Sequence, residues 1–356
     1  MNSRLQAVRA FGQGIWLDNL SRELWQSGAL KQWIEQDGIA GVTSNPAIFH
    51  KAIANDALYQ NDLAALKADP NLSAEARYEA LVLPDIQATC DILLPRYRET
   101  HGEEGYVSLE VSPALAHDVE GTLAAARRLW QAIERPNAMI KIPATAAGIA
   151  ALRHLIRDGI NINITLLFSA AQVEATWDAY IQGLNEREQD GHSLHQVKAV
   201  ASFFLSRVDS RLDPRLPAEL QGKTALALAR SVYQRYRERF HGMEFAALKA
   251  QGARPQYLLW ASTGTKNPAY SDVLYVEQLI GAETINTVPD ATLLAFRDHG
   301  QAAATLDSDR SGSQQHLAAL AALGIDLDQE GEILQQEGLV LFEHAFVALL
   351  ALTAVN

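Results

Sequence analysis

The sequence predicts a (β/α)8 barrel of the TIM type, with additional helices and a helical C-terminal extension. Short apolar runs alternate with longer helical patterns, and eight such runs occur along the 356 residues. Strands that alternate with helices indicate a parallel sheet, and eight such units favour a closed barrel over an open doubly wound sheet. The first run is not followed by G-x-G-x-x-G and the chain has no P-loop motif, which disfavours a dinucleotide-binding sheet. We expect residues 1–356 to form one barrel domain, with residues 300–356 packed on it as the extension.

The predicted strands are the apolar runs themselves. In chain order they cover residues 14–20, 38–46, 105–113, 138–144, 160–169, 198–207, 256–263 and 282–289. Helical patterns cover residues 21–38, a long stretch from the second strand to about residue 100, 118–134, 146–159, 170–189, a segment ending near residue 251, 314–327 and 330–352. Proline removes a backbone donor and clashes with the preceding turn, so Pro70 and Pro84 are expected to break the long stretch.

Charge and cysteine content narrow the possible partners and the location. The net charge of −12 disfavours a nucleic-acid partner, so an anionic ligand needs a local basic pocket. The single cysteine, Cys90, permits no internal disulfide, and the N-terminus lacks the apolar core of a signal peptide, so a cytoplasmic protein is expected. The longest apolar run, residues 339–355, contains Glu343 and His344 and is at the short limit for a membrane span. We therefore expect a docked terminal helix and no membrane association, in a monomer or a homodimer.

Polar residues form a stripe on one face of five predicted strands, near the carboxyl end of each. Active sites of barrels are built at that end. Most of these residues are small and could be core groups satisfied by the backbone. Lys141, Glu110 and Asp18 are ionisable, and burying an ionisable group costs several kcal/mol unless it is paired. Three of them on three strands indicate a functional site; the structural alternative is a buried lysine–carboxylate network that serves specificity.

A lysine beside carboxylates can form a Schiff base. A neutral amine attacks a ketone to give a carbinolamine, which loses water, and the protonated imine accepts electrons when a neighbouring C–C bond breaks. Free lysine titrates near pH ~10.4; removal from water lowers that pKa, and a close carboxylate opposes the change. A carboxylate is still needed to move protons, directly or through one water. The hypothesis is that Lys141 is the nucleophile, Glu110 the general acid/base and Asp18 the second proton carrier.

A metal site is the chemical alternative, and the sequence disfavours it. The ten histidines fall mainly in predicted helices and loops, whereas metal-dependent barrels place histidines on strands. His192 and His195 have the spacing of a ligand pair but lie in a polar loop. Cys90 lies in a helical pattern and is expected in the core. We expect no bound metal.

The segment over residues 260–272 follows the seventh predicted strand and could receive a phosphate. Its Ser and Thr hydroxyls, its backbone N–H groups and Lys266 are suitable donors, and barrels often bind phosphate after strands seven and eight. Arg207, at the end of the sixth predicted strand, would supply a second cation. A Ser/Thr/Gly turn taken alone is commonly a plain loop.

Five long motifs occur in the order in which one enzyme family carries them. They are GVTSNPAIF, SLEVSP, MIKIPATAAGIAAL, GININITLLFS and ASFFLSRVD, on the second to the sixth predicted strands. Through them the sequence resembles the transaldolases, Schiff-base enzymes of the pentose phosphate pathway, over most of residues 10–300. The resemblance implies transfer of a dihydroxyacetone unit from sedoheptulose 7-phosphate or fructose 6-phosphate to glyceraldehyde 3-phosphate or erythrose 4-phosphate.

The resemblance also implies catalytic roles. Lys141 would be the Schiff-base nucleophile, and Asp18 would handle the proton of C–C cleavage. Glu110 and Thr165 would hold the water that serves Schiff-base formation. The family uses no metal and no organic cofactor, so none is expected.

Six further residues are implied to bind the sugar phosphate. Those for substrate hydroxyls are Asn45, Asn163 and Ser202, and those for the phosphate are Arg207, Ser262 and Lys266. Better-known family members carry arginine directly after the serine motif, where this chain has the run STGTK. Lysine supplies the charge but not the planar, bidentate fork of arginine.

Two alternatives remain open. A fructose-6-phosphate aldolase uses the same chemistry but releases dihydroxyacetone; such relatives usually carry glutamine in place of Glu110 and tyrosine near the equivalent of Phe204, so both positions favour transfer. An inactive barrel that serves as a binding scaffold is disfavoured because Lys141, Glu110 and Asp18 are all present.

Overall fold

Eight parallel strands close into a barrel in the computed structural model, which describes residues 3–355. Each strand pairs with its neighbours in chain order, and β8 closes on β1. The strands are β1 (Gln13–Leu17), β2 (Ile39–Val42), β3 (Tyr106–Glu110), β4 (Ala138–Pro143), β5 (Ile162–Leu167), β6 (Ala199–Phe204), β7 (Tyr257–Ala261) and β8 (Thr284–Val288). The predicted barrel and its eight strands are confirmed.

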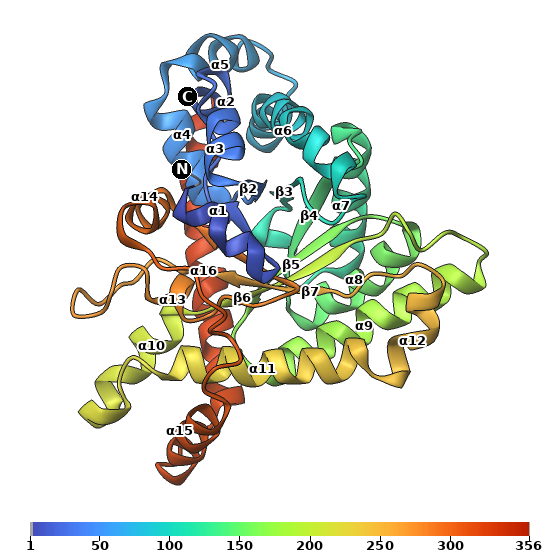
Figure 1. Cartoon of the computed structure of the whole chain (residues 1–356). Helices are drawn as coiled ribbons and strands as arrows, with labels where there is room; N and C mark the ends of the chain where they lie inside the picture. Colours follow the sequence, from blue (N-terminus) through green and yellow to red (C-terminus); the bar gives the residue numbers. More distant parts are fainter. Residues whose placement is uncertain (1–2, 356) are drawn as a thin grey trace.

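Helices surround this barrel (Figure 1). They are α1 (Arg4–Val8), α2 (Arg22–Gln26), α3 (Ala29–Asp37), α4 (Pro46–Asn55), α5 (Gln60–Lys67), α6 (Ala74–Glu99), α7 (Val119–Ile133), α8 (Ala146–Asp158), α9 (Ala170–Gln189), α10 (Ser206–Leu212), α11 (Thr224–His241), α12 (Met243–Ala250), α13 (Leu274–Glu277), α14 (Asp290–His299), α15 (Arg310–Ala322) and α16 (Leu327–Thr353). α14 follows β8 directly and completes the eighth βα unit; it was not among the predicted helices.

The predicted break at Pro84 is wrong, whereas the break near Pro70 is confirmed. α5 ends at Lys67, and α6 then runs unbroken from Ala74 through both Pro84 and Pro95. An interior proline costs a helix about 3 kcal/mol in isolation. α6 buries one side of its length against the barrel, and most helical stability in proteins comes from such packing rather than from local preference.

Two predicted helices end or divide at glycines. The one predicted over residues 21–38 is two helices, α2 and α3, separated by Gly28 at φ 81°. The one predicted over 314–327 ends earlier, and Gly324 at φ 76° lies between α15 and α16. Glycine adopts this left-handed conformation without the steric strain of a side chain.

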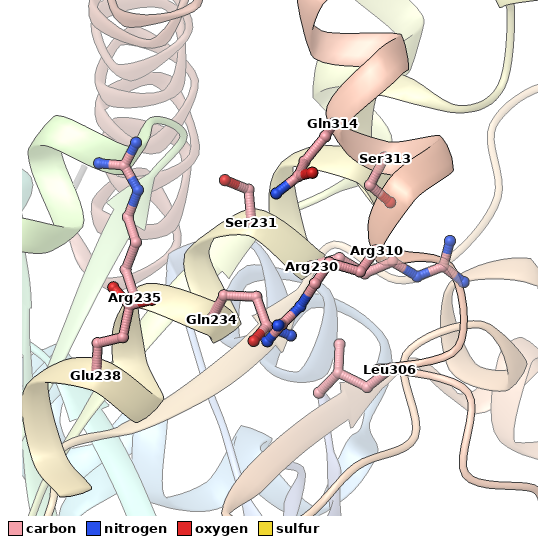
Figure 2. A pocket seen from close by; sticks show the side chains of 9 residues that line it. All are labelled: Arg230, Ser231, Gln234, Arg235, Glu238, Leu306, Arg310, Ser313 and Gln314. Atoms are coloured by element: carbon pink, nitrogen blue, oxygen red, sulfur yellow. The ribbon is translucent and has the colours of Figure 1, made fainter. Parts of the chain in front are cut away.

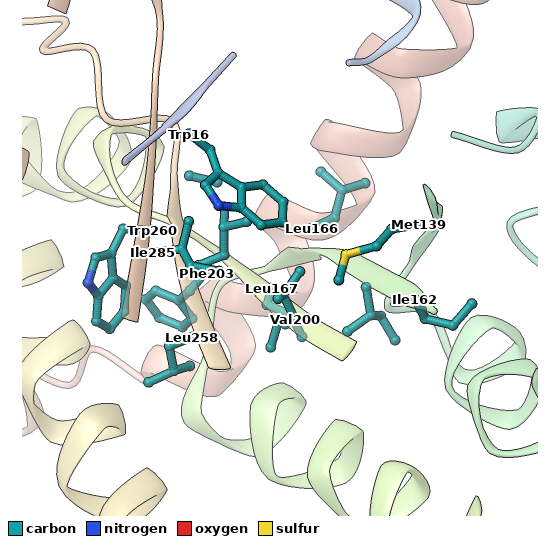
Figure 3. Packing of buried hydrophobic residues seen from close by; sticks show 14 of the residues in the cluster. Trp16, Met139, Ile162, Leu166, Leu167, Val200, Phe203, Leu258, Trp260 and Ile285 are labelled. Carbon is teal, nitrogen blue, oxygen red and sulfur yellow. The ribbon is translucent and has the colours of Figure 1, made fainter. Parts of the chain in front are cut away.

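The barrel interior is packed and is not a pore. Trp16, Met139, Val200 and Ile285 point into the barrel. Their strands place them on the same face as the polar residues of the stripe, or beside such residues on the neighbouring strand. A Cβ added to Gly41 would lie 2.5 Å from the Trp16 ring, so glycine makes room for the indole. Figure 3 shows these four side chains among other buried apolar residues of the barrel strands.

α16 lies across the carboxyl ends of the strands. It packs against α4, α6, α9, α10 and the end of β5, and runs the length of the molecule (Figure 1). The Nε2 of Gln335 donates to the carbonyl of Ala144 at 2.9 Å, just after β4, and to that of Leu166 at 3.0 Å in β5. By length and composition α16 is long and apolar enough to cross a membrane, but in this structure its buried side docks on the barrel.

Candidate active site

A cavity of about 220 Å³ opens at the carboxyl end of the barrel, beneath α16. Eight of the ten predicted site residues line it: Asp18, Asn45, Lys141, Thr165, Ser202, Arg207, Ser262 and Lys266. The other two, Glu110 and Asn163, lie directly behind the lining and contact residues in it. Residues far apart in the sequence thus meet because the strands that carry them end at the same rim.

Lys141 is buried at the centre of this arrangement. Register pairs Glu110 of β3 with Lys141 of β4, and Lys141 with Asn163 of β5, so the three side chains enter the barrel at one level. The Nζ lies 3.3 Å from Oε2 of Glu110 and donates to the carbonyl of Ser44 at 3.2 Å. The amine therefore stays within the barrel and does not extend to bulk solvent.

Glu110 is a poorly paired buried carboxylate. Burial raises the pKa of its carboxyl group above the usual range, and the opposing charge of Lys141 does not cancel this. Within residues 3–355, neither its Oε2 nor the Oγ1 of Thr165 has a well-aligned hydrogen-bond partner. Both atoms are buried, and an unsatisfied buried polar atom is expensive, so each is suited to receive a polar group of a ligand or water.

Asp18 follows β1 and faces the cavity. Removal from water raises the pKa of its carboxyl group, and Lys141 together with a hydrogen bond from Thr43 (Oγ1 to Oδ1, 2.8 Å) only partly opposes this. The hydroxyl of Thr43 also lies 2.7 Å from that of Thr287. An aspartate with a raised pKa, held in a fixed orientation, can accept and return a proton.

The two asparagines are used differently. Asn163 receives a hydrogen bond from Ser202 at 2.7 Å and donates to Ser108 at 3.1 Å, so its amide orients Ser202 in the cavity lining. Asn45 is the N-cap of α4, where its Oδ1 accepts from the backbone of Ile48 at 3.0 Å. The cap fixes the side chain and leaves its amide nitrogen to donate toward the cavity.

Two cations lie at the rim near Ser262. Arg207 is half-buried at the start of α10, and burial lowers the pKa of its guanidinium, opposed by Glu337. Lys266 is exposed in the loop after β7. Ser262 adopts φ 54°, unusual for a residue with a side chain, and its hydroxyl lies 2.8 Å from that of Ser206. Arg207 and Lys266 thus place two cationic side chains, together with Ser262, on the lining of one cavity.

Sequence reasoning missed Phe342 of α16. Its ring centroid lies 5.7 Å from the Nζ of Lys141, and it lines the same cavity. A phenylalanine in an apolar helical run carries no local signal of such a role. Only the tertiary path of α16 brings residues 141 and 342 together.

Other candidate clusters do not match the centre formed around Lys141. Within residues 3–355, no group of three His, Cys, Asp or Glu side chains is arranged to hold a metal ion. His192 and His195 are exposed in the loop before β6, and Cys90 is buried in α6, as expected for a core residue. A second hollow lies between α11 and α15, but Figure 2 shows the guanidinium groups of Arg235 and Arg310 pointing to opposite sides of it.

The closed barrel and the polar cavity at its carboxyl end define a barrel enzyme. Residues 15–353 match the family model described as Transaldolase/Fructose-6-phosphate aldolase. The chain is 56% identical to the transaldolase of Neisseria gonorrhoeae over 347 residues, which cover 98% of each chain. It is 52% identical to that of Thiobacillus denitrificans (97% of this chain, 98% of the relative) and 42% identical to that of Mycolicibacterium smegmatis (99% and 97%). The chain belongs to the transaldolase/fructose-6-phosphate aldolase family, and the predicted resemblance is confirmed.

Proposed function

We propose that this protein is a transaldolase that moves a three-carbon dihydroxyacetone unit between sugar phosphates through a Schiff base on Lys141. The observation that carries the proposal is the buried amine of Lys141, 3.3 Å from Glu110 in a cavity that Asp18 also lines. Relatives 52–56% identical over nearly the whole chain bear the name transaldolase. The donor would be sedoheptulose 7-phosphate or fructose 6-phosphate, and the acceptor an aldose phosphate.

The reaction begins when the neutral amine of Lys141 attacks the ketone carbon of the donor. The carbinolamine loses one water to give the protonated imine, which withdraws electrons from the neighbouring C3–C4 bond. Asp18 accepts the proton of the C4 hydroxyl as that bond breaks and the aldose phosphate leaves. The bonding electrons remain on the three-carbon unit as an enamine, which then adds to the carbonyl of the acceptor while Asp18 returns its proton to the new hydroxyl. One water adds to the resulting imine, the C–N bond breaks, and the product ketose leaves as the neutral amine of Lys141 is regenerated.

Glu110 and Thr165 serve the first half of this sequence. Carbinolamine formation and dehydration require a proton donor and acceptor near the nitrogen, and a water between the Oε2 of Glu110 and the Oγ1 of Thr165 would satisfy both buried atoms. The raised pKa of Glu110 keeps a proton available to this water nearer to neutral pH than an ordinary glutamate would.

The remaining predicted residues hold the substrate. Arg207, Lys266 and Ser262 lie together at the rim and would bind the phosphate. Asn45 and Ser202 line the same cavity and would bind the hydroxyls, with Asn163 holding Ser202 in place. Catalysis without a metal or organic cofactor, a cytoplasmic location and a monomeric or homodimeric state complete the proposal.

Borohydride trapping tests the proposal directly. Reduction in the presence of fructose 6-phosphate should leave a covalent three- or six-carbon adduct on Lys141, detected by peptide mass spectrometry. Lys249, exposed on α12, gives the matched control peptide and should stay unmodified. An unmodified Lys141 under conditions that trap a known Schiff-base aldolase would support the inactive scaffold instead.

The fructose-6-phosphate aldolase alternative predicts a different product. Such aldolases usually carry glutamine in place of Glu110 and tyrosine near the equivalent of Phe204, and here Phe204 lines the cavity as an apolar ring. We expect little free dihydroxyacetone from fructose 6-phosphate alone and fast turnover once an aldose phosphate is added. Rapid release of dihydroxyacetone without an acceptor would favour the aldolase.

A further inference from the structure

Phe342 lines the cavity but belongs neither to a barrel strand nor to a loop that follows one. It lies in the C-terminal helix α16, it is 9% exposed, and its ring stands 5.7 Å from the Lys141 nitrogen. The other groups around that nitrogen, Glu110 and the carbonyl of Ser44, are polar and lie within the barrel. The ring is thus an apolar cover on the side of the amine that faces α16.

Contacts on both sides of Phe342 fix the position of α16. Gln335 joins the helix to the ends of β4 and β5 through two backbone carbonyls. A Cβ added to Gly338 would lie 2.9 Å from the side chain of Leu166, so the helix approaches the strand closely at that point. Further along, the rings of Phe346 and Tyr78 pack edge to face with centroids 5.8 Å apart. Phe342 is therefore held over the cavity by the packing of the helix and is not a mobile side chain at a rim.

A transferase with a covalent three-carbon intermediate must protect it from water. The enamine on Lys141 can take a proton on carbon to become an iminium ion. One water then adds to that ion, the C–N bond breaks, free dihydroxyacetone leaves, and the proton and the neutral amine are regenerated. This route yields an aldolase product, so the ratio of transfer to release depends on how well the site excludes water while the acceptor binds.

We propose that Phe342 is a specificity-determining residue that keeps bulk water and its protons from the enamine on Lys141, so that the three-carbon unit passes to an aldose phosphate. The single water proposed between Glu110 and Thr165 lies on the barrel side of the amine and is not the water that the ring excludes. The inference rests on the transaldolase function proposed above. It assigns to α16 a share in reaction outcome and not only in stability. The ring needs no polar contact with the substrate, because its role is to occupy the volume on the α16 side through which bulk water would reach the nitrogen and the adjacent carbon.

The test compares two equal truncations on the same helix. Phe342→Ala removes the cover, whereas Phe346→Ala removes a ring of the same size that packs on Tyr78 and does not line the cavity. For each variant we measure free dihydroxyacetone formed from fructose 6-phosphate alone and transfer to erythrose 4-phosphate. The release-to-transfer ratio should rise roughly tenfold in Phe342→Ala. It should stay close to the wild-type value in Phe346→Ala, even if that variant melts earlier, because the Gln335 hydrogen bonds and the close approach at Gly338 still hold the helix on the strands. Phe342→Leu should give an intermediate ratio.

An unchanged ratio in a folded Phe342→Ala variant would overturn the inference, as would an equal rise in Phe346→Ala. Borohydride trapping on Lys141 separates this failure from failure of the proposed function. If the wild-type protein and Phe342→Ala both trap the adduct but have the same release-to-transfer ratio, only the inference about Phe342 is wrong. If the wild-type protein traps no adduct, the Schiff-base function itself is wrong.

Discussion

Two buried lysines enter the same barrel at opposite ends and have opposite surroundings. Lys141 lies in β4 near the carboxyl end, and Lys198 directly precedes β6 at the amino end. The Nζ of Lys198 lies 2.6 Å from Oε2 of Glu103 and 3.5 Å from the ring centroid of Tyr257. Lys141 has a glutamate too, but at 3.3 Å and without an aligned hydrogen bond to Oε2.

The partner carboxylates show what this difference means. Burial acts to raise the pKa of both. At Glu103, Lys198 and Arg254 outweigh burial and the pKa is lowered, whereas at Glu110 burial outweighs Lys141 and the pKa is raised. The glutamate at the amino end is therefore held in its charged form, whereas the glutamate at the carboxyl end keeps its proton to a higher pH than an ordinary glutamate. Burial also lowers the pKa of Lys198, yet that lysine does not line the cavity, so a perturbed amine alone does not make a site.

The largest expected effect is the loss of catalysis in Lys141→Met. Removing a covalent nucleophile should lower the transfer rate by at least ~10⁴-fold. The borohydride adduct should disappear, and the fold should remain, because Glu110 can stay protonated without its partner. Coupled-enzyme rates and trapped mass are the measurements. Residual transfer near wild type would show that another amine is used.

Glu110→Gln should produce the next largest effect. The amide keeps the shape but cannot exchange a proton, so adduct formation should slow by about 10²-fold or more. This rate is measured by adding borohydride at successive times after mixing with substrate and quantifying the adduct on Lys141. Because the pKa of Glu110 is raised, the wild-type rate should depend on pH above the usual titration range of glutamate, and that dependence should vanish in the variant. An unchanged pH profile would mean that Glu110 does not titrate in this step.

Lys198→Met should affect stability instead of activity. It leaves Glu103, which is 42% exposed, without its closest cation, and the free energy of unfolding should fall by about 1–3 kcal/mol. Urea unfolding measures the loss, with exposed Lys249→Met as the control. Transfer by the folded protein should remain close to wild type. A large fall in kcat with unchanged stability would contradict the conclusion that the amino-end lysine serves stability and the carboxyl-end lysine serves catalysis.

The smallest expected change in the free energy of unfolding is a gain of stability in Asp18→Asn, a variant that also loses transfer activity. The folded pKa of Asp18 is raised above the unfolded value near ~3.9, so between the two the folded protein binds more protons and stability falls as pH rises. The amide of asparagine cannot ionise, so the variant should not lose stability as the pH rises. It should be about 0.5–2 kcal/mol more stable than the wild-type protein at neutral pH, and inactive. Urea melts should converge below pH ~4. Exposed Glu120→Gln should show no such gain.

Local patterns in the sequence were sufficient to predict most of the fold and many residues of the candidate site. Period-two alternation in a strand is local, so polar residues such as Lys141 and Asp18 could be placed on one face before any coordinates. The uninterrupted α6 could not be predicted, because its packing, and not its own sequence, overrides Pro84. The cover by Phe342 depends on a contact across some two hundred residues, and the hydrogen bonds that turn Asn163 toward Ser202 depend on side-chain geometry.

Trp16 and Gly41 limit the depth to which a sugar can descend. The indole fills the axis one layer beneath Asp18, and any larger residue at position 41 would collide with it. A longer donor must therefore extend outward, toward the loop that carries Lys266. Engineering for bulkier ketoses would have to reshape that loop or α16, because Trp16 already closes the inner end of the cavity.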